Sequence, residues 1–327
     1  MKNILPITHS IIDSQALANL ISENWNLPEP IHCELLTRGM NDVYMIKDGK
    51  NNKWACRVWR SGFRSKNEIK FETDLLHYLF CNHYQVPNPI FTKDKLLFIP
   101  ILAPEGVRFF SIFSWVNGEN FGKDPSTKHA SALGVKIAEL HKLLKKFKPE
   151  TDRTIDMSAK LAKESINLLR MVTFEKDHLS WYDEAINILI NKINTTDYKN
   201  IDSGIIHGDF HLYNAFIDNN NNITIMDYDN CGFYYFIYDL CSFIWSNDYL
   251  GVDKKINQFF LEGYNSIKSI GRKEQSLMNL FYTIKEMSFL TGFATNVNYV
   301  GHTPFLNPDL EWFLKKTKTN FEKSGII

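Results

Sequence analysis

One short segment constrains this chain more than any other, and it reads Ile206-His207-Gly208-Asp209-Phe210-His211-Leu212-Tyr213-Asn214. It lies between two apolar strand candidates, which predicts a tight loop at the edge of a sheet. An asparagine follows Asp209 by five positions, and Asp227, at the end of the next apolar run, follows it by eighteen. Phosphoryl transfer to a hydroxyl requires this kind of set: one carboxylate that orients the hydroxyl and takes its proton, and oxygen ligands that hold Mg²⁺ on the phosphates.

The H-G-D-x-H-x-x-N segment, followed by Met226-Asp227-Tyr228-Asp229, resembles the aminoglycoside phosphotransferase/choline kinase family, whose members are distant relatives of protein kinases. The likeness extends in order over nearly the whole chain and is greatest to the homoserine-kinase-like and antibiotic-kinase branch. It implies an ATP- and Mg²⁺-dependent kinase with Asp209 as catalytic base and Asn214 and Asp227 as metal ligands. Tyr238-Asp239-Leu240 resembles the family segment whose aspartate supports the catalytic loop.

Three histidines in or near these motifs have a simpler interpretation. His207 and His211 form an H-x-x-x-H pair, which could bind zinc if it lay on a helix. Gly208 and the flanking strands disfavour a helix, so we interpret His207 as a hydrogen-bonded structural residue and expect His211 to pack beneath the loop. His141 matches a histidine often seen in this family, and we interpret it as structural as well.

The segment Trp54-Ala55-Cys56-Arg57 occupies the place of the V-A-I-K strand in the kinase pattern. Alternation puts Ala55 and Arg57 on one face of the strand, so Ala55 could cover an adenine while Arg57 reaches phosphate. Arginine replaces the usual lysine. Glu72, on the next predicted helix, fits the position that pairs with this cation, and Glu68 is the alternative. A purely structural ion pair is the other interpretation.

Two further segments are candidates for nucleotide binding by resemblance. The turn within Leu36–Tyr44 resembles the family's phosphate-covering loop, with Gly39, Met40 and Asn41 as its candidate residues. Phe113-Ser114-Trp115-Val116 resembles the interlobe hinge, where the backbone of Ser114, Trp115 and Val116 would bind adenine. An ordinary hairpin and plain core aromatics are the respective alternatives.

Periodicity predicts an α+β protein with a small β-rich lobe and a larger helical lobe, which is the bilobal protein-kinase-like fold of the resemblance. Strands are predicted over Ile31–Thr37, Val43–Ile46, Trp54–Trp59, Leu96–Ile101 and Arg108–Val116. Helices are predicted over Ser14–Trp25, with Asp13 as N-cap, and over Ser65–Phe80, Thr127–Leu144, Leu179–Ile193, Phe236–Trp245, Ile256–Ile267, Lys273–Thr295 and Asp309–Phe321. We expect a nucleotide-binding lobe at 1–116 and a catalytic and substrate-binding lobe at 117–327.

Bulk properties narrow the partners. Lys+Arg and Asp+Glu both number 37, so net charge indicates neither nucleic acid nor an anionic membrane. The five cysteines include no C-x-x-C pair and predict reduced core thiols in a cytoplasmic protein. We find no signal peptide and no run long enough to span a bilayer. The sequence leaves the oligomeric state open.

Charge patterning suggests the acceptor. Residues 201–250 contain seven aspartates and no Lys or Arg. Asp229 and Asp248, with Glu262 and Glu286 on later helices, would present negative potential that attracts an amine, as in an aminoglycoside-like or other antibiotic or an amino-alcohol metabolite. The alternative is that these acids face solvent. Tyr228 and Tyr234 are candidate pocket residues. A protein Ser/Thr kinase and a non-catalytic nucleotide-binding module are the competing functions.

Overall fold

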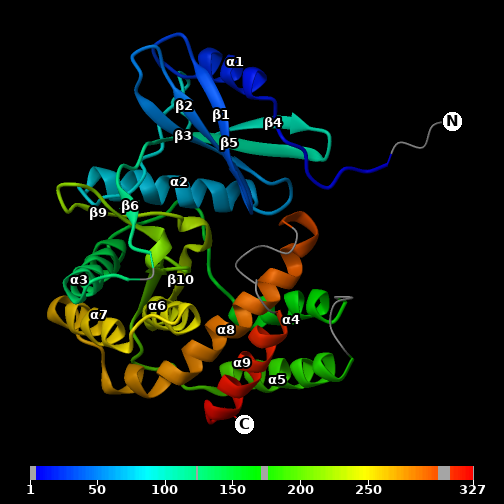
Figure 1. Ribbon diagram of the computed structural model, residues 1–327, viewed down its shortest axis with the longest axis vertical. Coiled ribbons are helices and arrows are strands. Elements are labelled where there is room, and N and C mark those ends of the chain that lie inside the picture. The colour runs from blue at the N-terminus through cyan, green and yellow to red at the C-terminus, as the bar shows by residue number, and fades with distance from the viewer. Residues whose placement is uncertain (1–4, 123, 171–175, 301–309, 327) are drawn as a thin grey trace. The chain divides into compact units, whose positions relative to one another are not determined.

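The computed structural model describes residues 5–122, 124–170, 176–300 and 310–326 (Figure 1). The chain forms two compact units. Unit 1 comprises Met1–Glu119, Phe147–Asp152 and Phe216–Met226. Unit 2 comprises Asn120–Lys146, Arg153–Ala215 and Asp227–Ile327. Neither unit is therefore one continuous stretch of sequence.

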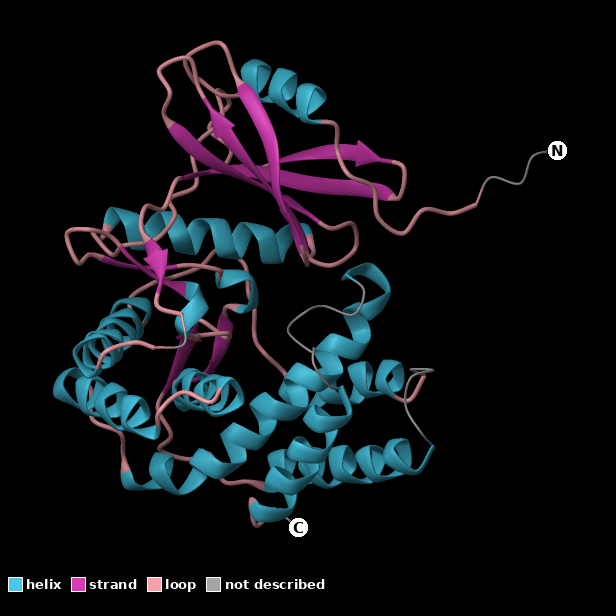
Figure 2. Ribbon diagram, viewed as in Figure 1, coloured by secondary structure: helices cyan, strands magenta, loops and turns pink. Residues whose placement is uncertain are grey.

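Unit 1 is built on a five-stranded antiparallel sheet of order β1-β2-β3-β5-β4 (Figure 2). Successive side chains of a strand point to opposite faces of the sheet, so one face of the central strands packs in a core and the other face meets α2. The strands are β1 (His32–Arg38), β2 (Asn41–Lys47), β3 (Lys53–Trp59), β4 (Ile99–Ala103) and β5 (Gly106–Ser114).

Helix α1 (Ser14–Asn24) covers one face of this sheet. Asp13 caps it by accepting a hydrogen bond from the backbone N–H of Ala16 at 2.8 Å, as the sequence predicts. Apolar side chains of the helix, with Trp25 just beyond it, pack on alternate residues of the central strands. This core contains Leu17, Ala18, Ile21, Trp25, Tyr44, Ile46, Cys56, Val58, Phe110 and Ile112.

Helix α2 (Lys66–Cys81) belongs to the other face of the sheet, since Arg57 on β3 reaches Glu72 on this helix. Its start is fixed by a capping box: the Ser65 side chain accepts from the Glu68 N–H, and the Glu68 side chain accepts from the Ser65 N–H. Glu68 is thus engaged in helix capping and also contacts Arg64. Among the two glutamates considered for Arg57, the structure selects Glu72.

Unit 2 is mainly helical, as Figure 2 shows. Its helices are α3 (Thr127–Leu144), α4 (Met157–Leu168), α5 (Lys176–Thr195), α6 (Ile237–Leu250), α7 (Lys254–Ile267), α8 (Arg272–Val300) and α9 (Leu310–Lys323). Gly134 on α3 and Gly263 on α7 each lie so close to the other helix's backbone that a Cβ would clash, at 2.0 Å and 2.1 Å. Within the described part of the chain, no helix is both long and apolar enough to cross a membrane.

Short strands accompany the helices of unit 2. Strands β7 (Ser203–Ile206) and β10 (Gly232–Tyr235) pair antiparallel, with Ile206 opposite Gly232. A second small sheet, in which β9 and most of β8 belong to unit 1, has the order β6-β8-β9 and is formed by Glu119–Asn120, Ala215–Ile217 and Ile223–Ile225. The Asn219–Asn222 run forms the hairpin loop between the last two strands, and Asp218 holds it by accepting hydrogen bonds from Asn220 and Asn222.

Most predicted elements are present, with four corrections. Helix α4 and the strands β6 and β10 are absent from the prediction, and β4 begins at Ile99 instead of Leu96. The prediction that all cysteines are core thiols is wrong for Cys81, which is exposed, and for Cys33, which is half-buried; Cys56, Cys231 and Cys241 are buried.

Candidate active site

The loop that carries Asp209 is formed where β7 ends. Pairing of Ile206 with Gly232 brings residues 207–214 next to the segment that follows Asp227. Gly208 has φ = 85°, and a Cβ at this position would lie 2.1 Å from the backbone oxygen of Asn230. Only glycine fits here, because both the backbone conformation and the contact with Asn230 exclude a side chain.

Asp239 anchors this loop from the first turn of α6. Its Oδ2 accepts a hydrogen bond from the backbone N–H of His207, and its Oδ1 accepts one from Gly208, both at 2.8 Å. The carboxyl is fully buried, and burial alone would raise its pKa. The hydrogen bonds from His141 and from the loop outweigh burial, so the pKa of Asp239 is lowered. The supporting role that the resemblance implies for Asp239 is thus matched by its contacts.

His141, on α3, is fully buried behind Asp239. Its Nε2 lies 3.0 Å from Asp239 Oδ2, and its Nδ1 lies 2.9 Å from the Tyr264 hydroxyl. The ring also stacks on Phe236 at 4.2 Å between centroids. Burial lowers the pKa of His141 despite the nearby Asp239. These contacts fit the structural interpretation of His141.

Asp209 is held by a lysine that the sequence analysis did not select. Lys285, on α8, places its Nζ 2.5 Å from Asp209 Oδ1. The Lys285 side chain is 7% exposed and that of Asp209 is 30% exposed. Asp209 also donates its backbone N–H to His207 Nδ1 at 3.2 Å, which makes His207 part of the hydrogen-bonded loop, as expected.

Charge on Asp209 is stabilised despite its surroundings. Burial would raise the pKa of this carboxyl, but the Lys285 ammonium and the hydrogen bond from it lower the pKa well below its usual range. Burial also lowers the pKa of His211 to about 4, so the imidazole beside Asp209 is neutral at pH 7. Asp209 is therefore ionised and His211 neutral at pH 7, so the carboxylate carries the only negative charge of this pair.

The two candidate metal ligands differ in how they are held. Asn214 donates from Nδ2 to the backbone oxygen of Asp209 at 3.0 Å, so its amide oxygen is the atom left for a cation. Asp227 adopts a left-handed backbone conformation, with φ = 61° and ψ = 65°. Such strain in a non-glycine residue is uncommon and concentrates at functional sites. An amide oxygen and a carboxylate are suitable donors for Mg²⁺, which needs few protein ligands when phosphates supply others.

A zinc site has no support in the described residues, where no group of three His, Cys, Asp or Glu side chains is arranged to hold a metal. His207 and His211 lie on a loop and on the residue before a short 3₁₀ turn, η1 (Leu212–Asn214), so they lack the helical spacing that zinc binding would need. His211 is half-buried, and its Nδ1 is a buried atom without a hydrogen-bond partner.

In unit 1, Arg57 Nη1 lies 2.6 Å from Glu72 Oε1. The Glu72 side chain is 1% exposed and that of Arg57 is 16% exposed, so the pair is buried at its acidic end. The guanidinium also lies 5.5 Å from the Phe113 ring centroid on β5. Ala55 is half-buried on the same strand, two residues before Arg57.

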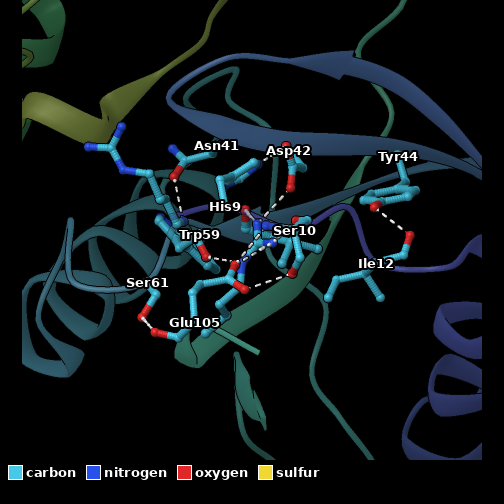
Figure 3. Close-up of polar contacts among 12 residues, drawn as sticks. His9, Ser10, Ile12, Asn41, Asp42, Tyr44, Trp59, Ser61 and Glu105 are labelled. Atoms are coloured by element: carbon cyan, nitrogen blue, oxygen red, sulfur yellow. Dashed lines mark hydrogen bonds and ion pairs between the residues drawn. The ribbon is translucent and has the colours of Figure 1, made fainter. Parts of the chain in front are cut away.

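Gly39 and Met40 form the turn between β1 and β2, and Asn41 begins β2. Asn41 Oδ1 accepts a hydrogen bond from the Arg60 N–H at 3.3 Å. Asp42, the next residue, is fully buried and pairs with Arg108 at 2.7 Å and His9 at 3.0 Å (Figure 3). The candidate phosphate loop is therefore anchored firmly where it enters β2.

Arg108, fully buried on β5, extends this network to the N-terminal segment. Its Nη1 donates to the Ser10 backbone oxygen at 2.8 Å and its Nε donates to the Trp59 oxygen at 2.9 Å. Ser10 in turn donates from its hydroxyl to Glu105 at 2.7 Å (Figure 3). A buried guanidinium is tolerated here because all three of its nitrogens donate to an acceptor.

The candidate hinge residues follow the hydrogen-bonded end of β5. Ser114 pairs with Trp54, and its hydroxyl accepts from the Asn88 N–H at 2.9 Å. Trp115 and Val116 lie beyond the strand and are half-buried, and the Lys53 ammonium lies 5.6 Å from the Trp115 ring centroid. The strand predicted to reach Val116 thus ends at Ser114.

The candidate substrate residues near Asp227 differ in exposure. Tyr228 is fully buried, with its ring 4.6 Å from that of His207, so it belongs to the core under the loop and does not line a pocket. Asp229 is 6% exposed, and its backbone oxygen accepts from Arg153 at 2.5 Å. Tyr234 is half-buried among Tyr235, Tyr238 and Phe281.

The prediction that the aspartates of residues 201–250 lie far from any cation is wrong, because helices distant in the sequence bring lysines next to them. Lys285 pairs with Asp209, and Lys316 on α9 donates to the Asp248 backbone oxygen at 2.8 Å. Glu286 is 2% exposed; burial raises its pKa to about 7, against the hydrogen bond from Asn320 at 2.9 Å. Glu262 is exposed on α7 and accepts a hydrogen bond from Gln258.

Lys285 is the important residue that sequence reasoning missed. It lies 76 positions from Asp209, and no local motif surrounds it. One signal was available: Lys285 and Glu286 are the only charged residues in the otherwise uncharged run 275–297. A charged pair on a buried helix requires partners, because unpaired burial of charge is costly.

Comparison with known proteins identifies the class. The chain matches the model of the phosphotransferase enzyme family over residues 33–270. An uncharacterised protein of Synechocystis sp. (sll1119) is 26% identical over 298 residues, which cover 89% of this chain and 80% of that protein.

Solved structures show the same fold at low sequence identity. The amicoumacin kinase hAmiN, in complex with AMP-PNP, Ca²⁺ and Ami, aligns with a TM-score of 0.78 at 16% identity, covering 96% of this chain and 95% of that one. A microcompartment-associated aminopropanol kinase aligns with a TM-score of 0.72 at 19% identity, covering 95% of each chain.

The fold and the loop define a kinase-like phosphotransferase, and the bilobal kinase-like fold class predicted from the sequence is confirmed. The chain belongs to the phosphotransferase enzyme family. The predicted enzyme class, a kinase with a hydroxyl acceptor, is confirmed with it.

Proposed function

We propose that this enzyme transfers the γ-phosphate of ATP, with Mg²⁺, to a hydroxyl of an amine-bearing small molecule. The observation that carries the proposal is the Asp209 carboxylate, ionised and fixed on a rigid loop, with Asn214 bonded to the same loop. Asp209 would accept the hydrogen bond of the acceptor hydroxyl and then its proton. Asn214 and Asp227 would hold Mg²⁺, which supplies neutralisation of phosphate charge.

Nucleotide binding is proposed for the N-terminal residues 1–116 and catalysis for residues 117–327. Arg57, fixed by Glu72, would engage phosphate, and the turn at Gly39, Met40 and Asn41 would cover it. Ala55 and the backbone of residues 114–116 would contact adenine. The AMP-PNP and Ca²⁺ held by the similar amicoumacin kinase support ATP and a divalent cation here.

An amine on the acceptor is supported by a group of aromatic and acidic side chains on α6, α8 and α9, of which Glu286 is buried. Lys316 Nζ lies 4.8 Å from the Trp312 ring centroid and 5.6 Å from that of Tyr249, so these rings already accommodate an ammonium. Glu286 and Asp248 add carboxylates to the same surroundings. The aminopropanol kinase that is similar in fold is named for an amine-bearing alcohol. Asp229, Tyr234 and Glu262 stay candidates for acceptor contacts.

A cytoplasmic location and a role in antibiotic resistance complete the proposal. Free thiols at all five cysteines suit a reducing compartment, and an antibiotic acceptor would make phosphorylation a means of inactivation.

A screen of acceptors tests the function. ADP release should be measured with ATP and Mg²⁺ against aminoglycosides, other amine-bearing antibiotics, amino alcohols, neutral polyols, hydroxy acids and a protein substrate mixture. An amine-bearing small molecule should give the highest kcat/KM, and chelation of Mg²⁺ should abolish turnover. A hydroxy acid as best acceptor would contradict the amine, and protein phosphorylation would contradict the small-molecule assignment.

A further inference from the structure

Lys285 is joined to Asp209 across a long stretch of sequence. It lies in the middle of α8, C-terminal to the residues 33–270 that match the family model. Its Nζ is 2.5 Å from Asp209 Oδ1, and both residues belong to unit 2.

Lysine is seldom buried without a partner, because desolvation of an ammonium is costly. The Lys285 side chain is 7% exposed, and its Nζ also lies 5.5 Å from the ring centroid of Trp245 on α6. Burial alone would lower the pKa of Lys285, but Asp209 outweighs burial and leaves the pKa raised. The ammonium is therefore confined between one carboxylate oxygen and one aromatic face.

The two oxygens of Asp209 are in different states. Oδ1 accepts the hydrogen bond from Lys285. Oδ2 has no hydrogen bond with any residue that the structure describes, and the Asp209 side chain retains 30% exposure. One oxygen is thus used to hold the carboxylate, and the other is available to a ligand.

We propose that Lys285 is a positioning residue for phosphoryl transfer: it fixes Asp209 through Oδ1, so that Oδ2 accepts the hydrogen bond of the acceptor hydroxyl. This inference rests on the proposed role of Asp209. In the transfer, the acceptor oxygen forms a bond to the γ-phosphorus while the bond from that phosphorus to the β,γ-bridging oxygen breaks. The hydroxyl proton passes to Asp209 Oδ2, and the Lys285 ammonium keeps all its protons.

Positioning is the contribution that this reaction needs most. Phosphoryl transfer passes through a loose transition state, so orientation of the hydroxyl matters more than the basicity of the carboxylate. Misplacement of a reacting group by about 1 Å can cost roughly 10²-fold in rate. Removal of Lys285 should therefore lower kcat without weakening nucleotide binding.

The test compares Lys285→Met, which keeps length and removes charge, with Lys285→Arg, which keeps charge. We expect Lys285→Met to lower kcat by about 10- to 100-fold with KM for ATP within about twofold of wild type. Lys285→Arg should recover part of the lost kcat. A kcat for Lys285→Met within about twofold of wild type would overturn the proposal.

Lys268→Met is the matched control. Lys268 is also in unit 2, its side chain is 12% exposed, and it pairs with an aspartate, Asp202, that belongs to no proposed site. Both substitutions remove one ammonium from a Lys–Asp pair. Lys268→Met should keep kcat within about twofold of wild type; an equal loss in both variants would mean that the effect is general destabilisation and would reject the positioning role.

A double-mutant cycle decides whether Lys285 acts through Asp209. If it does, Lys285→Met should cause no further loss of kcat in an Asp209→Asn background. An undiminished further loss would overturn the proposal. The double variant also carries the test if Lys285→Met alone does not fold, because it leaves no unpaired buried charge. Substantial activity in Asp209→Asn itself, above about a tenth of wild type, would instead reject the base assignment.

Discussion

At the scale of single residues, the loop formed by residues 207–214 requires glycine at position 208. Gly208 combines a left-handed backbone with contact against the Asn230 carbonyl, and the neighbouring Asp209 takes its place from that geometry. A motif read from the sequence names these residues. The structure shows what holds each residue in place: a left-handed backbone conformation at Gly208, and an ion pair with Lys285 at Asp209.

We predict that Gly208→Ala destabilises the protein by more than backbone strain alone, which is roughly 1–2 kcal/mol. A Cβ would lie 2.1 Å from the Asn230 oxygen, so β7 and the segment after Asp227 would have to separate. Gly251→Ala is the control, since Gly251 has φ = 71° and no atom within 4 Å of its Cβ position. Thermal and urea denaturation should rank the Gly208 variant well below the control; equal losses would show that the contact with Asn230 relaxes easily.

We predict that Asp227→Ala weakens binding of Mg²⁺–ATP far more than binding of metal-free ATP. A residue that coordinates the cation contributes little when the cation is absent. Calorimetric titrations with Mg²⁺ and with chelator provide the comparison. Equal losses in both conditions would make Asp227 a structural residue whose left-handed backbone serves only the turn that follows it.

At the scale of secondary-structure elements, the proposed site is surrounded by helices that carry buried charged side chains in unit 2. Asp239, in the first turn of α6, accepts hydrogen bonds from the loop that carries Asp209, and α8 supplies both Lys285 and Glu286. Sequence periodicity located these helices and their approximate ends. It could not show which distant loop each buried charge would meet, because pairing across 76 residues depends on tertiary packing.

We predict that Glu286→Gln stabilises the protein at pH 8 and changes stability little below pH 5. Burial raises the pKa of Glu286 from 4.5 to about 7, so the folded state binds an extra proton between these values and loses stability as pH rises through them. Each pKa unit is worth about 1.4 kcal/mol, which makes ionised Glu286 cost roughly 3 kcal/mol above pH 7. Glutamine removes that cost and can still accept from Asn320.

Thermal melts of this variant from pH 4.5 to pH 8.5 check the prediction. The difference in melting temperature from wild type should grow to several degrees across this range. Glu322→Gln, at an exposed glutamate on α9, should show no such trend. If amine-bearing acceptors bind Glu286, the stabilised variant should also bind them more weakly, since sites that bind charge commonly sacrifice stability. A pH-independent difference would mean that Glu286 is already ionised at low pH.

At the scale of the whole molecule, the motifs and their order along the chain predicted the class of protein correctly. They did not predict the charge around the candidate site. The order of small β-rich and large helical parts predicted the kinase-like fold. The seven aspartates of residues 201–250 suggested an uncompensated negative field. Folding brings Lys145 and Lys268 to Asp202 and Lys285 to Asp209, so a local count of charges misjudged a property of the assembled chain.

The same scale tests the division of labour proposed for residues 1–116 and 117–327. Arg57 lies in unit 1 with Glu72, and Asp209 lies in unit 2 with Lys285.

We predict that Arg57→Ala raises KM for ATP by about tenfold or more while KM for the acceptor changes less than about threefold, because a guanidinium contributes bonds to phosphate and none to the acceptor. Arg57→Lys should retain part of the ATP affinity, since an ammonium replaces the charge but not a bidentate contact. Lys70→Ala, which removes a half-buried cation from α2 paired with Asp74 and Glu150, should leave both constants near wild type. Steady-state kinetics with each substrate varied in turn gives both KM values for each variant. Unchanged ATP kinetics in Arg57→Ala would assign phosphate binding to another cation, with Arg60 the first to substitute next.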